Sequence, residues 1–424
     1  MKKIVNLSTV IGVISLSVVC LSLYAQPSEP LRTARLLSEA REPVRVVCFG
    51  DSITGIYYHS GNRRAWPEML KIALNRLYPK ADVTVVNAGI SSQTTVHGLA
   101  RMQKDVLDRK PHLVVIMFGM NDLAYGTVTP EQDAARKVSF AGNLKTMVGK
   151  CRDAGAEVIL CTQNPVYPEA SPARLPQRLG EFAEIICRMG AELKGPVTDI
   201  YAEWSALKSA DPHAWRLLMS ETIHPSMAGH KRMAEQVAET IAGRSVSLAD
   251  VLPEQPVCNT LIARLRAGQP VTIAAPAQLV SPVRAMVLRR FPGTEVTIIP
   301  LGENSISLDA SVKEHKELRT SKPHLAFVSL GPDLLTIDDD EHFIRQVSWV
   351  VNWSLPFGGS AWTAVGVDPA LICPELTQPQ QAGAVVLRQI VQGHDLDWIA
   401  AAPNAQDALD SWFDRQLPPL KVIP

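Results

Sequence analysis

The chain of 424 residues lacks an excess of charge of either sign. Its 42 lysine and arginine residues are balanced by 42 aspartate and glutamate residues, so the formal net charge is +0. A protein that binds nucleic acid or an anionic surface usually carries a clear basic excess. The balanced composition therefore speaks against a nucleic-acid partner.

The chain also lacks the residue spacings that indicate a metal site. None of its seven cysteines stands at metal-ligand spacing from another, and no cluster of histidine, aspartate and glutamate has such spacing either. Cys48 and Cys161 lie inside apolar, strand-like runs, which favours buried thiols. A disulfide stays open for an exported protein, but the sequence assigns no pair.

A long apolar run occurs only at the N-terminus. Met1-Lys2-Lys3 precedes an apolar stretch from Ile4 to Tyr24, which Ala25-Gln26-Pro27 follows. This pattern resembles a secretory signal peptide over residues 1–25 and predicts export to the periplasm or the medium. Two alternatives stay open: an uncleaved helix that anchors the protein in the membrane, and lipid attachment at Cys20, to which the preceding residue fits poorly. A membrane is a partner only if the segment is not cleaved.

The length and composition predict more than one globular domain. Hydrophobic residues make up 46% and charged residues 20% of the chain, as in ordinary proteins with sizeable cores. We expect a linker at 26–42, a first domain at 43–245, a second linker at 246–268 where Pro253 and Pro256 change the pattern, and a second domain at 269–424.

Alternating strands and helices in the first domain predict an α/β fold. Short apolar strands are expected at 44–49, 82–86, 113–118 and 157–161. Amphipathic helices are expected at 66–77, around 143–152, and after residue 226 as far as Gly243. Repeated strand–turn–helix units of this kind form a parallel sheet covered by helices on both faces.

Polar residues and glycines gather where the predicted strands end. The first strand runs into Gly50-Asp51-Ser52, the second ends at Gly89, and the third is followed by Gly119-Met120-Asn121-Asp122. His224-Pro225 comes later, in a loop that enters the last helix of the domain. Because open α/β sheets bind ligands at the carboxyl ends of their strands, these blocks are expected to meet at one edge.

The four blocks, in this order, resemble the SGNH (GDSL) hydrolases over roughly residues 42 to 245. The resemblance implies a flavodoxin-like three-layer α/β/α sandwich, hydrolysis of acyl esters, and no metal or organic cofactor. Ser52 is then the nucleophile and His224 the general base. The oxyanion donors are the backbone N–H groups of Ser52 and Gly89 and the side-chain amide of Asn121. Glu221 stands where the family usually has aspartate, three residues before the histidine.

Glu221 is the expected third member of the triad, and a Ser–His dyad aided by a backbone carbonyl is the alternative. Asp51 and Asp122, as neighbours of the nucleophile and of the amide, are expected to support the loop geometry. His230 is expected to be a surface or packing histidine. The segment 57–66, which contains Tyr57 and Tyr58, either rims the site or is a solvated loop.

The substrate class stays open between acetylated carbohydrates, lysophospholipids and other short acyl esters. Export and the additional domain favour acyl groups on polysaccharides. The alternative is a catalytically inactive protein that binds cell-surface or extracellular polysaccharide, with Glu221 as a sign of decay. A metal-dependent hydrolase is a weak third reading. The sequence does not indicate the oligomeric state.

The second half of the chain repeats the first without its chemistry. Residues 110–113 return as 322–325, residues 83–86 return as 296–299, and residues 221–225 return as 375–379. Along this alignment Leu279 replaces the serine, Asp333 the asparagine and Gln378 the histidine, and none of these can serve the same role. The sequence therefore predicts a second, smaller α/β domain that is a degenerate, non-catalytic copy, with a structural, shielding or substrate-binding role.

Overall fold

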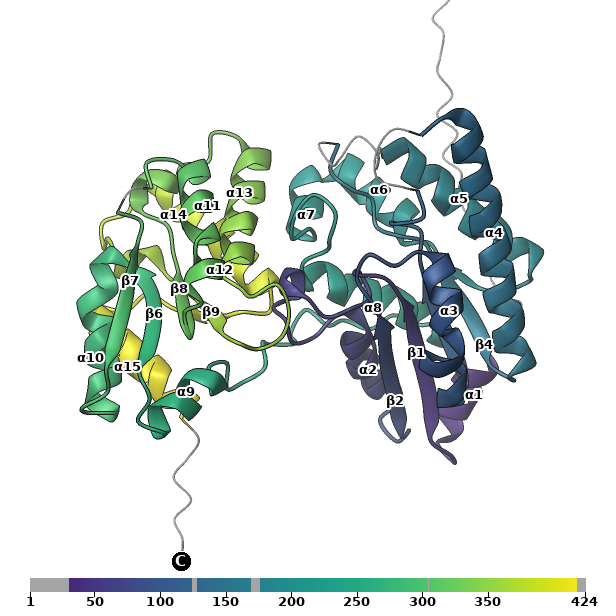
Figure 1. Cartoon of the computed structure of the whole chain (residues 1–424), viewed down its shortest axis with the longest axis horizontal. Helices are drawn as coiled ribbons and strands as arrows, with labels where there is room; N and C mark the ends of the chain where they lie inside the picture. Colours follow the sequence, from purple (N-terminus) through teal and green to yellow (C-terminus); the bar gives the residue numbers. More distant parts are fainter. Residues whose placement is uncertain (1–29, 124–127, 169–175, 304, 418–424) are drawn as a thin grey trace, which may run out of the picture.

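The computed structural model describes residues 30–123, 128–168, 176–303 and 305–417, and Figure 1 shows that they form two lobes. Each lobe holds one parallel five-stranded sheet with helices packed around it. This confirms the predicted α/β class and the second α/β unit. The signal peptide predicted at 1–25 lies outside the described residues.

The first sheet has the strand order β2-β1-β3-β4-β5, and every neighbouring pair is parallel. Its strands are β1 (Val44–Gly50), β2 (Val83–Gly89), β3 (Leu113–Met117), β4 (Glu157–Cys161) and β5 (Val197–Thr198). The chain moves outward from β1 in one direction to β2 and in the other to β3. A crevice for ligands opens at such a reversal, beyond the carboxyl ends of the strands.

Helices cover both faces of this sheet (Figure 1). The helix α2 (Trp66–Leu77) begins and ends as predicted from its apolar stripe, and it packs against α8 (Met227–Ala242). The remaining elements of the first domain are α1 (Arg32–Glu39), η1 (Tyr58–Ser60), α3 (Thr95–Asp105), η2 (Leu107–Arg109), α4 (Pro130–Asp153), α5 (Pro176–Glu192), α6 (Ile200–Ala210) and α7 (Pro212–Leu217).

The second sheet has the order β10-β9-β8-β6-β7, which follows the same path as the first. Its strands are β6 (Val271–Pro276), β7 (Val296–Leu301), β8 (Leu325–Val328), β9 (Thr363–Val367) and β10 (Asp397–Ile399). The helical elements around it are α9 (Asn259–Arg266), η4 (Ala277–Leu279), α10 (Val280–Arg290), α11 (Leu308–Lys316), α12 (Leu318–Ser321), η5 (Pro332–Leu334), α13 (Asp340–Trp353), η6 (Pro369–Leu371), α14 (Gln378–Gly393) and α15 (Ala405–Gln416).

The repeated Lys-Pro-His-Leu segments have the same structure in both domains. Lys110 and Lys322 both adopt the left-handed conformation, with φ of 51° and 47°. The Nδ1 atom of His112 accepts the backbone N–H of Arg45 at 3.0 Å, and that of His324 accepts the N–H of Thr272 at 2.9 Å. The repeat thus holds the start of the third strand against the start of the first in each sheet.

Each of the two segments predicted as linkers contains a packed helix, α1 in 26–42 and α9 in 246–268. In the segment 26–42, α1 buries Leu37 to 1% exposure, and the Glu157 carboxylate accepts the backbone N–H groups of Arg32 and Thr33, each at 2.7 Å. In the segment 246–268, α9 buries Leu261 in the core of the second domain. The polar composition of both segments concealed these few apolar anchors.

Two further findings concern the described residues as a whole. None of their helices combines the length and the apolar character needed to cross a membrane.

The six cysteines of the described residues are unpaired, and all except Cys373 are buried. Burial raises the pKa of the Cys151 and Cys161 thiols to about 12, so both are protonated and unreactive at neutral pH.

Candidate active site

The structure places Ser52 beside His224 although 172 positions separate them in the sequence. The Ser52 Oγ atom lies 2.9 Å from His224 Nε2, which is hydrogen-bond distance. Ser52 lies in the turn that follows β1, where the Asp51 carbonyl accepts the N–H groups of Thr54 and Gly55 at 3.2 and 3.0 Å. This turn presents the hydroxyl at the carboxyl edge of the sheet.

His224 is carried by a short closed loop, residues 219–225, which we call the His224 loop. Met219 and Pro225 form an antiparallel bridge at its two ends. The N–H of Ser220 donates to the His224 carbonyl at 2.9 Å, and the N–H of Tyr167 donates to the Thr222 carbonyl at 3.0 Å. These backbone bonds hold the imidazole at a defined place above the sheet.

Glu221 uses both carboxylate oxygens inside this loop. Its Oε1 atom accepts the backbone N–H of His224 at 3.0 Å and contacts His224 Nδ1, while Oε2 accepts the N–H of Ile223 at 3.1 Å. Burial alone would raise the pKa of Glu221, but the charge of His224 and these hydrogen bonds outweigh it and lower the pKa. Glu221 is therefore ionised and orients the ring through Nδ1–H, which leaves Nε2 as the acceptor that faces Ser52.

The hydroxyl, the imidazole and the carboxylate thus form one continuous hydrogen-bonded chain. A neutral imidazole that accepts at Nε2 can remove the proton of the serine as its oxygen attacks. A buried carboxylate on the other side stabilises the imidazolium that forms. The structure brings together the three residues for which the sequence predicted these roles.

The predicted oxyanion donors have different surroundings. The N–H of Ser52 has no hydrogen-bond partner among the described residues. The Asn121 side chain is buried, at 5% exposure, and its Nδ2 donates to the Gln93 carbonyl at 3.1 Å. The N–H of Gly89, in contrast, donates to Asn87 Oδ1 at 3.0 Å. It is therefore not directed at a substrate, and the predicted role of Gly89 needs correction.

Gly89 is required for close packing instead. A Cβ atom at this position would lie 2.3 Å from the backbone nitrogen of Gly55, in the turn that carries the nucleophile. No side chain fits at that distance, so Gly89 lets β2 approach the nucleophile turn.

Ser92, which the sequence prediction missed, is the better candidate for a backbone donor. The N–H groups of Gly89, Ile90 and Ser91 donate to Asn87 Oδ1, the Gly50 carbonyl and Tyr57 Oη. Within the described chain the N–H of Ser92 has no such partner. Ser92 also adopts a φ of 62°, which is uncommon for serine. Backbone strain of this kind gathers at functional sites, but sequence patterns do not reveal it.

Asp51 and Asp122 hold the loops of the site rather than forming a paired acid. The Asp51 carboxylate accepts the N–H of Ile53 at 3.0 Å and Gln163 Nε2 at 3.3 Å. The Asp122 Oδ1 atom accepts the N–H and the hydroxyl of Thr95 at 2.9 and 2.5 Å, and its burial raises its pKa. Both carboxylates therefore have the surroundings of supporting residues.

Two buried histidines lie behind His224. The ring of His59 stacks on that of His224 with centroids 4.6 Å apart and planes 9° from parallel, and His230 stacks on His59 at 5.4 Å. Burial, with the nearby histidines, lowers the pKa of His59, and burial lowers that of His230 to about 3. Both rings are neutral at neutral pH, so neither opposes a positive charge on His224.

Aromatic side chains from both domains line the rim beside His224. The Tyr58 ring lies 6.5 Å from the His224 ring and 5.8 Å from that of Phe357, and Tyr57 lies 6.0 Å from Phe357. Phe357 belongs to the second domain and is 58% exposed. The Arg319 guanidinium covers the Tyr58 ring at 5.1 Å. Within the segment 57–66, Tyr57 and Tyr58 therefore lie at the rim of the site, whereas Arg63 and Arg64 contact the segment 252–257 and Asp395 instead.

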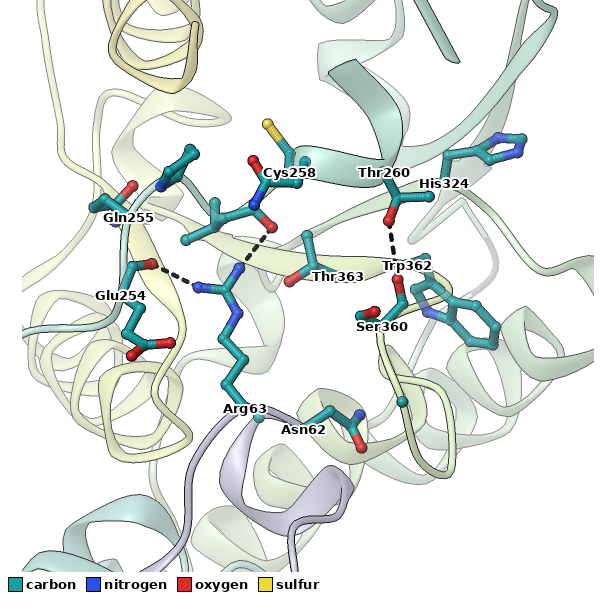
Figure 2. Close-up of a pocket in the computed structure, with 15 residues that line it drawn as sticks. Asn62, Arg63, Glu254, Gln255, Cys258, Thr260, His324, Ser360, Trp362 and Thr363 are labelled. Atoms are coloured by element: carbon teal, nitrogen blue, oxygen red, sulfur yellow. Dashed lines mark hydrogen bonds between the residues drawn. The ribbon is translucent and has the colours of Figure 1, made fainter. Parts of the chain in front are cut away.

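A cavity of about 640 Å³ lies elsewhere, between residues 61–63 of the first domain and residues 254–260, 324 and 359–363. In Figure 2 the Arg63 side chain crosses it and donates to the backbone carbonyls of Glu254 and Val257. Cys258 and His324 line this cavity, but burial raises the pKa of the Cys258 thiol to about 12, so it is protonated and not a nucleophile at neutral pH. We therefore place the candidate active site at Ser52 and His224, which lie within hydrogen-bond distance of each other, rather than in this cavity.

Comparison with known proteins agrees with this location. The GDSL-like Lipase/Acylhydrolase family matches residues 48–232, a range that contains Ser52, Glu221 and His224. These residues form a GDSL-like domain. The family is one of lipases and acylhydrolases, and relatives named as esterases match the same part of the chain, which supports a hydrolase of carboxylic ester bonds. The second domain lies beyond the matched range, and its description as a degenerate copy stays a prediction.

Three relatives of the GDSL-like domain illustrate the range of the family. An uncharacterized lipoprotein YqeF of Bacillus subtilis is 36% identical over 132 residues, which cover 30% of this chain and 51% of that protein. An acetylxylan esterase of Geobacillus stearothermophilus is 28% identical over 165 residues, covering 38% of this chain and 73% of that protein. Esterase TesA of Pseudomonas aeruginosa is 28% identical over 207 residues, covering 49% and 92%.

Proposed function

We propose that this protein is an exported serine esterase in which Ser52, His224 and Glu221 are the catalytic triad. The observation that carries the proposal is the 2.9 Å contact between Ser52 Oγ and His224 Nε2, with Glu221 on the opposite side of the imidazole. The triad lies within the residues that the GDSL-like family matches.

In the proposed reaction Ser52 Oγ attacks the ester carbonyl carbon while its proton passes to His224 Nε2. The C–O bond to the alcohol then breaks, and the alcohol leaves with the proton that His224 had accepted. Water next attacks the acyl-enzyme with His224 again as base, the acid is released, and Ser52 regains its proton. The N–H groups of Ser52 and Ser92 and the amide of Asn121 stabilise the negative oxygen in both steps.

The proposed substrates are short acyl esters, and acetyl groups on carbohydrate are favoured among them. Similarity to an acetylxylan esterase supports this choice. The exposed Phe357 beside Tyr57 and Tyr58 also suits a sugar ring, because sugars and aromatic faces both bury apolar surface on contact. Export is supported by the signal-like N-terminus and by similarity to a lipoprotein.

Turnover of p-nitrophenyl acetate by wild type and by Ser52→Ala tests the proposal. Wild type should hydrolyse the ester, should be labelled by a fluorophosphonate probe and should lose both properties in the variant. A folded wild-type protein whose rate equals that of buffer would instead favour the inactive polysaccharide-binding protein. Equal labelling of wild type and variant would exclude Ser52 as the nucleophile. Acetylated sugars compared with longer acyl esters then define the substrate.

A further inference from the structure

Ser220, the residue before Glu221, is bound by the second domain through both its side chain and its backbone. It is completely buried. Its carbonyl accepts Asn352 Nδ2 at 2.9 Å, and its hydroxyl lies 2.9 Å from Asn352 Oδ1 and 3.1 Å from His394 Nε2. Its N–H donates to the His224 carbonyl at 2.9 Å. Each polar group of Ser220 therefore has a partner, and two of the three groups have theirs in the other domain.

Asn352 and His394 are themselves held in place. Asn352 lies near the end of α13 and His394 directly follows α14, and both are completely buried. His394 Nδ1 lies 2.6 Å from the Ile390 carbonyl, which can only accept, so Nδ1 carries a proton. Burial lowers the pKa of His394 to about 4, so the ring is neutral and its Nε2 can only accept. The single hydroxyl proton of Ser220 therefore points between two acceptors, Asn352 Oδ1 and His394 Nε2. Two rigid groups thus hold one residue of the His224 loop.

A second contact between the domains fixes the segment of the second domain that contains His394. Asp395, which follows His394, forms a buried ion pair with Arg64 of the first domain, with Nε and Oδ2 2.9 Å apart. Gly61 packs so closely here that a Cβ atom would lie 2.4 Å from the His394 carbonyl oxygen. The position of His394 relative to the first domain is therefore set by independent contacts.

We propose that Asn352 and His394 are positioning residues for the catalytic triad, so that the second domain is a required part of the active site. They act through Ser220 on Glu221, which holds His224 at the angle at which Nε2 meets Ser52. Because misplacing a catalytic group by about 1 Å can cost about 100-fold in rate, a contact one residue from the triad carboxylate affects catalysis without touching substrate. This inference rests on the proposed function of the site.

Asn352→Ala tests the inference, in the wild type and in a Glu221→Gln background. In the wild type kcat should fall about tenfold while KM changes less than about twofold, since the substrate contacts are intact. With Glu221→Gln already present, Asn352→Ala should lower kcat by less than about twofold, because the group through which it acts has been removed. Asp340→Asn is the matched control: it lies on the same helix α13 and also contacts the first domain, through Arg216 at 2.7 Å. It should leave kcat unchanged.

Thermal unfolding checks that Asn352→Ala is folded. If it is not, Ser220→Ala replaces it, because this variant removes only the hydroxyl and keeps the carbonyl bond to Asn352. Unchanged kcat in the folded variant would overturn the inference. An equal loss of kcat in the wild type and in the Glu221→Gln background would also overturn the inference, because it would indicate a general structural effect.

A readout that needs no turnover separates this inference from the proposed function. The proton between His224 Nδ1 and Glu221 should give a low-field proton NMR signal that Glu221→Gln abolishes. Asn352→Ala should shift or broaden the signal, and Asp340→Asn should not. If the wild type shows the signal and its dependence on Asn352 but no ester hydrolysis, the function fails and the positioning stands. If the wild type hydrolyses esters but Asn352→Ala leaves the proton signal unchanged, the positioning inference fails while the proposed function stands.

Discussion

Glu221 shows how a glutamate takes the place of the shorter aspartate. Its carboxylate lies within its own loop, where it accepts the N–H groups of Ile223 and His224 and the hydroxyl of Thr222. These bonds fold the longer side chain back, so that one oxygen still reaches the imidazole. The loop thus accommodates the additional methylene while His224 Nε2 lies 2.9 Å from Ser52 Oγ.

Glu221→Gln should lower kcat by about 10⁴-fold, the loss seen when a triad carboxylate becomes an amide. The amide carries no charge to stabilise the imidazolium, and it favours the wrong tautomer of His224. Steady-state kinetics with p-nitrophenyl acetate measure the effect. A loss of less than about tenfold would indicate the Ser–His dyad instead.

Ser92 should respond in opposite ways to two substitutions. Ser92→Gly relieves the left-handed backbone and keeps the N–H, so activity should be retained and stability should not fall. Ser92→Pro removes the N–H and forces φ to about −65°, so kcat should fall at least about 100-fold. If the Pro variant folds and keeps full activity, Ser92 does not donate to the oxyanion.

At the scale of elements, the site depends on short irregular segments more than on the sheet. The helical turn η1 carries Tyr58 and His59, the two rings that flank His224. The loop after α13 contributes Phe357, whose carbonyl accepts the N–H of Tyr58 at 3.4 Å. The sheet fixes where Ser52 stands, while these two segments shape the approach to it.

Phe357→Ala should therefore affect bulky substrates selectively. Losing one aromatic contact worth about 0.5–1.5 kcal/mol should raise KM for an acetylated oligosaccharide about three- to tenfold. KM for p-nitrophenyl acetate, which is too small to span the rim, should stay unchanged. Val385→Ala is the control, since Val385 is an equally exposed apolar residue of the second domain, also at 58%. Equal KM changes for both substrates would contradict a rim role.

For the whole molecule, buried polar contacts join the two domains. Besides the Arg64–Asp395 pair, Asn352 and His394 contact Ser220 across the joint. His394 is neutral and buried, as are His59 and His230 of the first domain. A buried histidine with a lowered pKa links folding to pH. Below pH 6.5, the ordinary pKa of histidine, His230 takes up a proton in the unfolded chain. In the folded protein its pKa is about 3, so it takes up the proton only near pH 3.

The free energy of unfolding should accordingly be highest above pH 6.5 and fall as the pH decreases toward 3. Each such histidine contributes about 1.4 kcal/mol per pH unit in that window. Urea unfolding of wild type and His230→Gln between pH 5 and 7.5 measures it. The variant should show a slope smaller by about that amount below pH 6. Identical slopes would mean that His230 is not held neutral.

The sequence by itself determined the features that neighbouring residues encode. An apolar strand that ends in Gly50-Asp51-Ser52 forms its turn from local hydrogen bonds, and the apolar stripe of α2 specifies that helix. The repeated order of strands and turns likewise predicted the second sheet. By contrast, the first half of α4 is mostly exposed and has no apolar stripe, so the predicted helix around 143–152 began too late.

Only the tertiary structure decided how the site is completed. The loop after β2 lies against Tyr57, and its path decides which backbone N–H groups are paired. The N–H of Gly89 donates to Asn87, whereas the N–H of Ser92 has no partner among the described residues. The contacts of Asn352 and His394 with Ser220 span 132 and 174 positions. Contacts at such separations arise from the packing of two domains, and the spacing of residues along the chain does not encode them.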